Sequence, residues 1–370
     1  MKDSKRIMLV DTLSKLDKED AIDFSYELGF DLDTTLTANN FSEEFAKAIL
    51  DDPRAVLSQL PLIDLETIKS LKDVNDGSNT INIYENHYPS LLVVYGLAQE
   101  RRDGYKYGLQ FGEDFRETAL PIIDEVMDDK EVVRRLTIES IVSGLANLYG
   151  QVTHGMVKRE LVRTKIYASE EEADSIIIEA WKHSILLKWM ACPENVVYYK
   201  PTDSMPYVSR YGWSSPSDLK QEVTKHDSVA KDYRLFTQME IVMAAREPLP
   251  LIPNPMQEKF TAFLRDNFNL HKWEVLEICH DIWFYAMHKG DATHSQQNPA
   301  DYFDECVLKP QEADEELRYD AFHLLDDYLN QMPHWQLKGH TPAETGALLE
   351  HHEMQSKIGR AVQQECRDRS

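Results

Sequence analysis

Apolar side chains recur at intervals of three and four residues along most of the chain, and this spacing constrains the fold more than any other feature. Because an α-helix turns once every 3.6 residues, the spacing places these side chains on one helical face. Helices are predicted over residues 5–16, 17–28, 42–50 and 62–74. Gly29 suits the end of the second helix, and Ser42 suits the N-cap of the third. We therefore expect a compact helical module at residues 1–75.

A β-hairpin is predicted immediately after this module. Two runs with strand-like composition, residues 91–97 and 105–111, flank the pair Asp103-Gly104. Asp-Gly between apolar runs is a strong hairpin signal, because glycine accepts the positive φ of a tight turn. In the second run every other residue is large and apolar, so one face of the hairpin should be buried. A helix is expected to follow over residues 113–128.

Residues 130–200 have the layout of a winged helix. The periodicity predicts helices over 130–149 and 153–165, and a third that begins at Ser169, with Glu172 at the capping-box position. Residues 186–190 and 196–199, separated by a Pro193 turn, read as a closing β-hairpin.

The remaining chain is predicted to be a linker and a helical domain. Prolines and Gly212 interrupt residues 201–235, which read as a linker or a surface-packed loop. Three aromatic residues there suit either an exposed anchor for a partner or packing against the core: Tyr207, Tyr211 and Trp213. Capping boxes begin at Thr237 and at Thr341. Helices are expected over residues 256–268, 271–288, 299–307, 311–331 and 342–357.

The fold class expected is mainly α, a multi-module helical protein with small β-hairpins, including a winged-helix-like unit. A chain of 370 residues is long for one core, which favours several domains. The predicted parts are a helical module at 1–128, a winged-helix-like unit at 129–200, a linker at 201–235, a helical domain at 236–358 and a tail at 359–370.

The net charge and the cysteines indicate which partners and which cellular compartment to expect. The formal charge of −24 opposes binding to nucleic acid, which depends on lysine and arginine neutralising phosphates. No apolar run approaches the roughly 20 residues that span a bilayer, and the N-terminus lacks the pattern of a secretory signal. The four cysteines, Cys192, Cys279, Cys306 and Cys366, form no close pair, so we expect free buried thiols. A cytoplasmic protein that does not enter membranes is expected.

The sequence contains no recognisable catalytic or metal motif. The phosphate-binding glycine loops and the GxSxG elbow do not occur. Cys279, His280 and Asp281 are adjacent, so a helix points them in different directions and they do not converge on a metal. We therefore predict no catalytic residue, no metal and no cofactor. An enzyme with a site assembled from scattered residues, such as His280, Asp281 or His340, remains an alternative.

Basic residues gather within the winged-helix-like unit. Lys158, Arg159 and Arg163 lie on its second predicted helix and are the candidate binding residues there. The third helix, which enters the major groove in DNA-binding relatives of this layout, begins with Ser169-Glu170-Glu171-Glu172. These carboxylates would face phosphates, so a protein-binding or structural unit is favoured over a DNA reader.

The stretch from Leu329 to Glu344, LNQMPHWQLKGHTPAE, resembles a signature of uncharacterised bacterial proteins associated with the SEC-C motif. In that group an Asn and a Pro-x-Trp precede a Gly-His-Thr-Pro-x-Glu turn that opens the last helix. The helical pairs at the N-terminus also resemble the small N-terminal module of the Rho termination factor. Trp335 and His340 are carried by this likeness as further binding candidates, although a buried Trp335 and a helix cap at Thr341 would explain the pattern structurally.

Relatives in this group often end in a zinc-binding tail that begins Ile-Gly-Arg and continues into closely spaced cysteines. Here Ile358-Gly359-Arg360 is followed by Ala361 and by the single Cys366, so zinc is not carried over. The leading hypothesis is a non-enzymatic adaptor or regulatory protein that acts by binding another protein. The alternatives are a nucleic-acid-associated regulator and the enzyme described above; the oligomeric state is left open.

Overall fold

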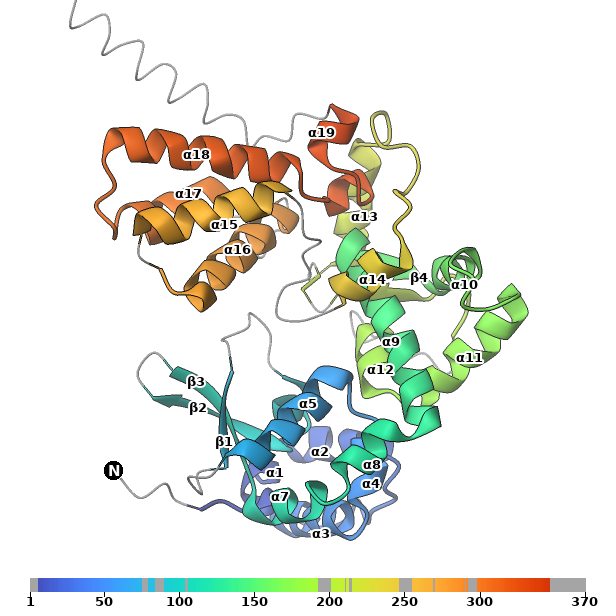
Figure 1. Cartoon of the computed structure of the whole chain (residues 1–370). Coiled ribbons are helices and arrows are strands. Elements are labelled where there is room, and N and C mark those ends of the chain that lie inside the picture. Colours follow the sequence, from blue (N-terminus) through green and yellow to red (C-terminus); the bar gives the residue numbers. More distant parts are fainter. Residues whose placement is uncertain are drawn as a thin grey trace, which may run out of the picture. The chain divides into compact units, whose positions relative to one another are not determined.

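The computed structural model describes residues 6–74, 79–83, 90–103, 106–191, 201–209, 211–212, 215–245, 255–268, 270–289, 291 and 298–346. The described residues are mainly helical with two small antiparallel sheets, which confirms the prediction of a mainly α fold with small β-hairpins (Figure 1). It divides into two compact units: unit 1 comprises residues 1–142, 153–192 and 196–207, and unit 2 comprises residues 143–152, 193–195 and 208–370. The boundaries predicted after residues 128, 200 and 235 fall inside these units and stay predictions.

Unit 1 begins with short helices that bury one apolar face each. They are α1 (Leu9–Leu13), α2 (Lys18–Glu27), α3 (Ala38–Asp51), α4 (Pro53–Leu57), α5 (Leu62–Ser70) with the 3₁₀ turn Leu71–Asp73, α6 (Leu91–Val94), α7 (Glu113–Ala119) and α8 (Ile123–Asp128). Gly29 follows α2 with φ of +89°, as predicted. The predicted N-cap at Ser42 is wrong. The side chain of Thr37 caps α3 instead, and the Ser42 hydroxyl donates to the Ala38 carbonyl inside the helix.

The sheet of unit 1 has the strand order β1-β3-β2. Its strands are β1 (Thr80–Ile83), β2 (Ala98–Asp103) and β3 (Lys106–Phe111). The hairpin is where the Asp-Gly pair predicted it, and Leu109 and Phe111 are buried. Its first strand begins at Ala98, however, because the Ser90 hydroxyl caps the backbone N–H of Leu92 and residues 91–94 form α6. Strand β1 was not predicted.

The predicted winged-helix-like stretch contains α9 (Lys130–Tyr149), α10 (His154–Arg163) and α11 (Glu170–Lys182), close to the predicted bounds. The strand predicted at 186–190 is wrong, because these residues belong to helix α12 (Ile185–Ala191). Residues 196–199 lie outside the described residues. An unpredicted strand, β4 (Gln151–Thr153), pairs with β5 (Pro206–Val208). The winged-helix interpretation stays a prediction.

The predicted linker contains β5 and helix α13 (Pro216–Lys225). Tyr207 and Tyr211 are buried, as expected if they pack against the core, and Trp213 lies outside the described residues. The remaining elements of unit 2 are α14 (Gln238–Ala244), α15 (Pro255–Phe268), α16 (Lys272–Met287), α17 (Pro299–Phe303), the π-helical turn Asp304–Leu308, α18 (Glu315–Asn330), the 3₁₀ turn Trp335–Leu337 and α19 (Pro342–Thr345).

Helices α15 to α18 pack together within unit 2, α15 lying against both α16 and α18 (Figure 1). The capping boxes predicted at Thr237 and Thr341 are both present. Helix α19 ends at Thr345, and its C-cap Gly346 has φ of +65°; the rest of the helix predicted to reach residue 357 lies outside the described residues.

Two of the four cysteines are described, and both are free thiols. Cys279 is buried as predicted, whereas Cys306 is exposed and corrects that prediction. Among the helices that the structure describes, none combines the length and the apolar character that crossing a bilayer requires.

Candidate functional site

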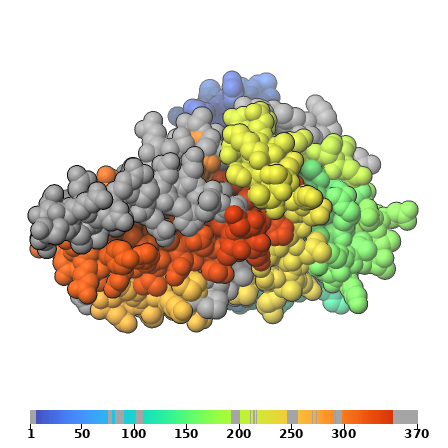
Figure 2. Space-filling view, turned by 90° about the horizontal axis from the view of Figure 1, so that it is seen from above, coloured from blue at the N-terminus to red at the C-terminus, as the bar shows by residue number. Residues whose placement is uncertain are grey.

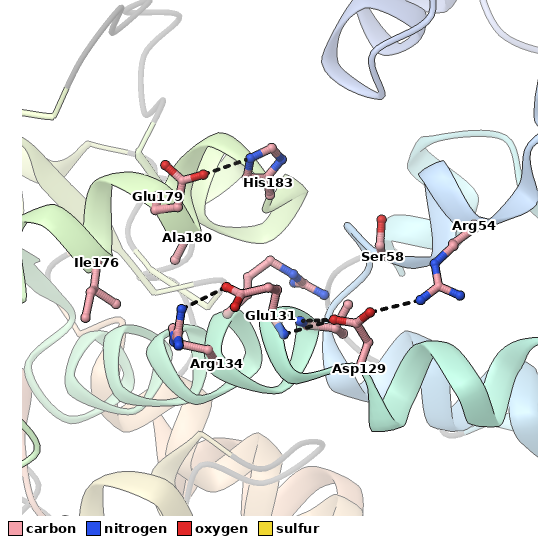
Figure 3. Close-up of a pocket in the computed structure, with 11 residues that line it drawn as sticks. Arg54, Ser58, Asp129, Glu131, Arg134, Ile176, Glu179, Ala180 and His183 are labelled. Carbon is pink, nitrogen blue, oxygen red and sulfur yellow. Dashed lines mark hydrogen bonds and ion pairs between the residues drawn. The ribbon is translucent and has the colours of Figure 1, made fainter.

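Unit 1 contains a pocket of about 370 Å³. It is bounded by α4, by the first turns of α9 and by α11 (Figure 3). The lining residues are Arg54, Ser58, Asp129, Glu131, Val132, Arg134, Arg135, Ile176, Glu179, Ala180 and His183. None of these residues is among the binding candidates predicted from the sequence.

The apolar lining comes from two helices. Ile176 and Ala180 are four residues apart on α11, so they lie on one face of that helix. Val132 on the first turn of α9 is nearly fully buried. Together these three side chains give the pocket an apolar floor.

Charged side chains surround this floor, and they pair with one another. Arg54 contacts Glu125 at 2.6 Å and Asp129 at 2.9 Å. Arg134 contacts Glu131 at 2.8 Å, which is an i,i+3 pair on α9 (Figure 3). On the opposite wall His183 lies 3.2 Å from the Glu179 carboxylate.

The pKa shifts at the rim all favour the charged forms. Backbone N–H groups of Glu131 and Val132 donate to Asp129, and with Arg54 they lower the pKa of its carboxyl group. Hydrogen bonding to Glu125, and then to Asp129, raises the pKa of Arg54. The ammonium of Lys182 lowers the pKa of Glu179. General acid–base catalysis needs a group whose pKa lies near neutrality. These shifts move the pKa values of Asp129, Arg54 and Glu179 further from neutrality.

A buried ion pair forms part of the pocket wall through Arg135. Arg135 and Glu139 pair along α9, both nearly inaccessible to solvent, and a second guanidinium N–H of Arg135 donates to the Leu60 carbonyl at 2.8 Å. Burial raises the pKa of Glu139 despite the attraction of Arg135 and a hydrogen bond from Ser184. Such a pair is costly to desolvate, and removing either partner leaves a buried charge. We assign it the role of orienting α9 against residues 60 and 184.

The basic residues predicted to bind a partner are mostly neutralised within the fold. Lys158 pairs with Asp203 and lies 3.5 Å from Asp174. Arg163 forms a bidentate contact with Glu160, its Nε donating to Oε1 and its Nη2 to Oε2. Arg159 is exposed. The pairing reduces the positive field that phosphate binding would need.

His154, at the start of α10, forms a polar cluster that was not predicted from the sequence. It is fully buried, with Nε2 2.8 Å from the Asp174 carboxylate and Nδ1 3.2 Å from the Tyr207 hydroxyl. Burial lowers the pKa of His154 and raises that of Tyr207. The cluster connects α10 to α11 and to β5, and none of its residues lines the pocket. We read it as a structural link.

The two candidates carried by the family likeness lie in a turn of unit 2. Trp335 is fully buried, and its indole N–H donates to the Asn147 carbonyl at 2.7 Å. His340 Nε2 lies 3.0 Å from the Asp232 carbonyl, and its Nδ1 lies 3.5 Å from Glu344. These contacts support the structural explanation of the turn.

Two candidates for the alternative enzyme site, His280 and Asp281, do not form a short contact with each other. His280 Nδ1 lies 3.7 Å from the Asp281 carboxylate, whose other oxygen accepts a 2.5 Å hydrogen bond from Tyr302. Within the described ranges, no group of three or more histidine, cysteine, aspartate or glutamate side chains is arranged to hold a metal ion.

Comparison of the chain with protein-family models, with curated proteins and with solved structures finds no match.

Proposed function

We propose that the chain is a non-enzymatic adaptor that binds another protein, and that the pocket of unit 1 receives an apolar side chain of that partner. The observation that carries this proposal is an apolar floor, made by Val132, Ile176 and Ala180, inside a rim of paired charges. Protein interfaces have this anatomy, with an apolar centre and a polar rim.

The size of the pocket agrees with a side chain as its occupant. Its volume of about 370 Å³ is large enough to admit one aromatic or branched aliphatic side chain. A single aromatic or branched anchor seated in such a pocket commonly dominates the energy of an interface. The rim pairs would then contact the polar residues on either side of the anchor.

A cytoplasmic setting and membership of the SEC-C-associated bacterial group belong to the same proposal. The likeness of residues 329–344 supports the group. The net charge of −24 supports solubility and a partner that is not nucleic acid.

Site-specific photocrosslinking tests the pocket directly. A photoreactive amino acid replaces Glu179 on the rim, and a matched one replaces Tyr26, which is 59% exposed on α2 of the same unit. We expect a discrete protein adduct from position 179 and not from position 26. Adding Ala180→Leu, which fills the floor, should reduce that adduct at least tenfold.

Two results would contradict the proposal. One is a set of adducts that is the same from positions 179 and 26, because it would reflect surface exposure alone. The other is a discrete adduct from position 179 that Ala180→Leu leaves unchanged while circular dichroism shows the variant folded.

A further inference from the structure

The guanidinium group of Arg135 contains one donor that the fold leaves unused. Its Nη1 pairs with Glu139, and its Nη2 donates to the Leu60 carbonyl at 2.8 Å. Its Nε is buried and has no hydrogen-bond partner among the described residues, and the whole side chain is only 4% exposed. A buried donor without an acceptor costs free energy, and the cost is larger for a charged group. An acceptor supplied by another molecule would therefore be bound favourably at this Nε.

This donor belongs to the pocket of unit 1. Arg135 is one of the lining residues, whereas Glu139 and Leu60, the partners of its two Nη groups, are not. The Nη groups are thus held outside the lining, and the Nε side of the guanidinium is the part left for an occupant. In apolar pockets, a few polar groups of this kind fix the orientation of what is bound.

The pocket is open to another molecule. The side chains of Glu131, Glu179 and His183 on its rim are 71, 60 and 63% exposed. Helix α11, which carries the second of these, has exposed residues along its length, and Figure 2 shows this light green segment at the surface. A side chain of a partner can therefore reach the apolar floor past the rim.

The charges around the pocket favour a neutral acceptor. The ionisable lining, apart from one histidine, consists of three arginines and three carboxylates: Arg54, Arg134, Arg135, Asp129, Glu131 and Glu179. Each of these arginines already pairs with a carboxylate. Hydrogen bonds lower the pKa of Asp129 and of Glu179, so both are charged at neutral pH. A further carboxylate would be repelled by these charges, whereas a neutral oxygen would not.

We propose that the anchor side chain that enters the pocket is a tyrosine, an inference that rests on the proposed function. Its ring lies on the floor made by Val132, Ile176 and Ala180, and its phenolic oxygen accepts a hydrogen bond from Arg135 Nε. Phenylalanine and leucine have no acceptor, and the indole of tryptophan has only a donor. Tyrosine is also one of the residue types that dominate the energy of interfaces.

Binding of side-chain analogues to the full-length chain tests this preference. Calorimetric titration compares p-cresol, which represents tyrosine, with toluene, which represents phenylalanine. A hydrogen bond to a charged group contributes roughly a factor of ten or more in affinity, so p-cresol should bind at least about tenfold more tightly than toluene. The carboxylate p-toluate should bind more weakly than p-cresol. Ala180→Leu, which fills the floor, should abolish the binding of all three probes.

Arg135→Lys keeps a positive charge beside Glu139 but removes the Nε–H, so the affinities for p-cresol and toluene should come within about threefold of each other. Arg134→Lys is the matched control, because Arg134 is 55% exposed on the rim, and it should keep the preference. Circular dichroism checks that both variants fold. If Arg135→Lys does not fold, the comparison of the probes in the unmodified chain decides alone.

The outcomes separate this proposal from the proposed function. Equal affinities for p-cresol and toluene, both lost in Ala180→Leu, would overturn tyrosine as the anchor and leave the pocket as a site for an apolar side chain. Binding of neither probe, or binding that Ala180→Leu leaves unchanged, would count against both. A preference for p-cresol that persists in folded Arg135→Lys would overturn the assignment of Arg135 as the donor.

Discussion

The indole N–H of Trp335 donates to the backbone carbonyl of Asn147, 188 positions earlier in the chain, at 2.7 Å. Asn147 lies in the last turn of α9, where helical carbonyls have no partner within the helix. Its side chain is used as well, because its amide donates to the Ala244 carbonyl and its oxygen accepts from Ser209. One indole and one asparagine thereby connect four segments of unit 2.

Trp335→Phe should lower the free energy of unfolding of unit 2 by roughly 1–3 kcal/mol, because it leaves a buried carbonyl without a donor. Trp335→Ala should cost more, about 3–5 kcal/mol, because it also leaves a cavity. Urea unfolding followed by circular dichroism measures both. Tyr26→Phe, on the exposed face of α2, is the control and should change little. A loss below about 0.5 kcal/mol for Trp335→Phe would contradict this assignment.

Gly144→Ala should destabilise the chain although alanine is the better helix former by about 1 kcal/mol. A Cβ at Gly144 would lie 2.0 Å from the Ile241 carbonyl oxygen, so α14 would have to move away from α9. Gly155→Ala, whose Cβ would meet its nearest neighbour at 3.2 Å, is the matched control and should change stability less. Thermal unfolding compares the melting temperatures of the two variants. A decrease for Gly144→Ala that is no larger than that for Gly155→Ala would show that α14 moves away at little cost.

Stability should fall as the pH drops from 6.5 toward 4, partly because of His334. Burial lowers the pKa of this imidazole to about 4 from an ordinary value near 6.5. Between these values the unfolded chain binds the proton and the folded chain does not, so protonation favours unfolding. The contribution of His334 at pH 5 relative to pH 7 is about 2 kcal/mol.

Urea unfolding at pH 7 and pH 5 measures this dependence. His334→Gln should reduce the difference between the two pH values, whereas Tyr26→Phe should keep it. His154 in unit 1 acts in the same direction, because burial also lowers its pKa, so a residual difference is expected. An unchanged difference in His334→Gln would mean that His334 does not carry the effect.

Thr237→Ala should cost about 1 kcal/mol, because the Thr237 hydroxyl caps the N–H of Glu240 at the start of α14. Thr224→Ala is the control. Its hydroxyl only bonds back to the Lys220 carbonyl on an exposed face of α13. Chemical denaturation measures the free energy of unfolding of the two variants. Equal losses would argue against the capping box as a stabilising contact.

Helices with strong end signals were the part of the fold that the sequence predicted best. Thr237 and Thr341 begin helices as expected, and α9 has the predicted bounds, because capping and periodicity are local properties. Residues 91–94 were predicted wrongly as a strand. Their β-branched and leucine composition suits either state, and the Ser90 cap decided for helix.

The pocket could not have been predicted because its lining comes from residues 54, 129–135 and 176–183, which only the packing of three helices brings together. Each of its charged residues looked like an ordinary solvated helix face. Lys158 and Arg163 show the converse. The sequence suggested that these two residues form a basic surface. In the fold, Asp203 pairs with Lys158 and Glu160 pairs with Arg163, so their positive charges are neutralised.

The turn at residues 334–341 has a consequence for the order in which the two units can complete themselves during synthesis. Unit 1 has all its segments once residue 207 has been made. In unit 2 the backbone carbonyls of Asn147, Lys231 and Asp232 obtain their hydrogen-bond donors only after Trp335, Lys338 and His340 have been synthesised. Because domains fold as units and N-terminal ones fold first on the ribosome, unit 2 should remain unfinished until almost the whole chain has emerged.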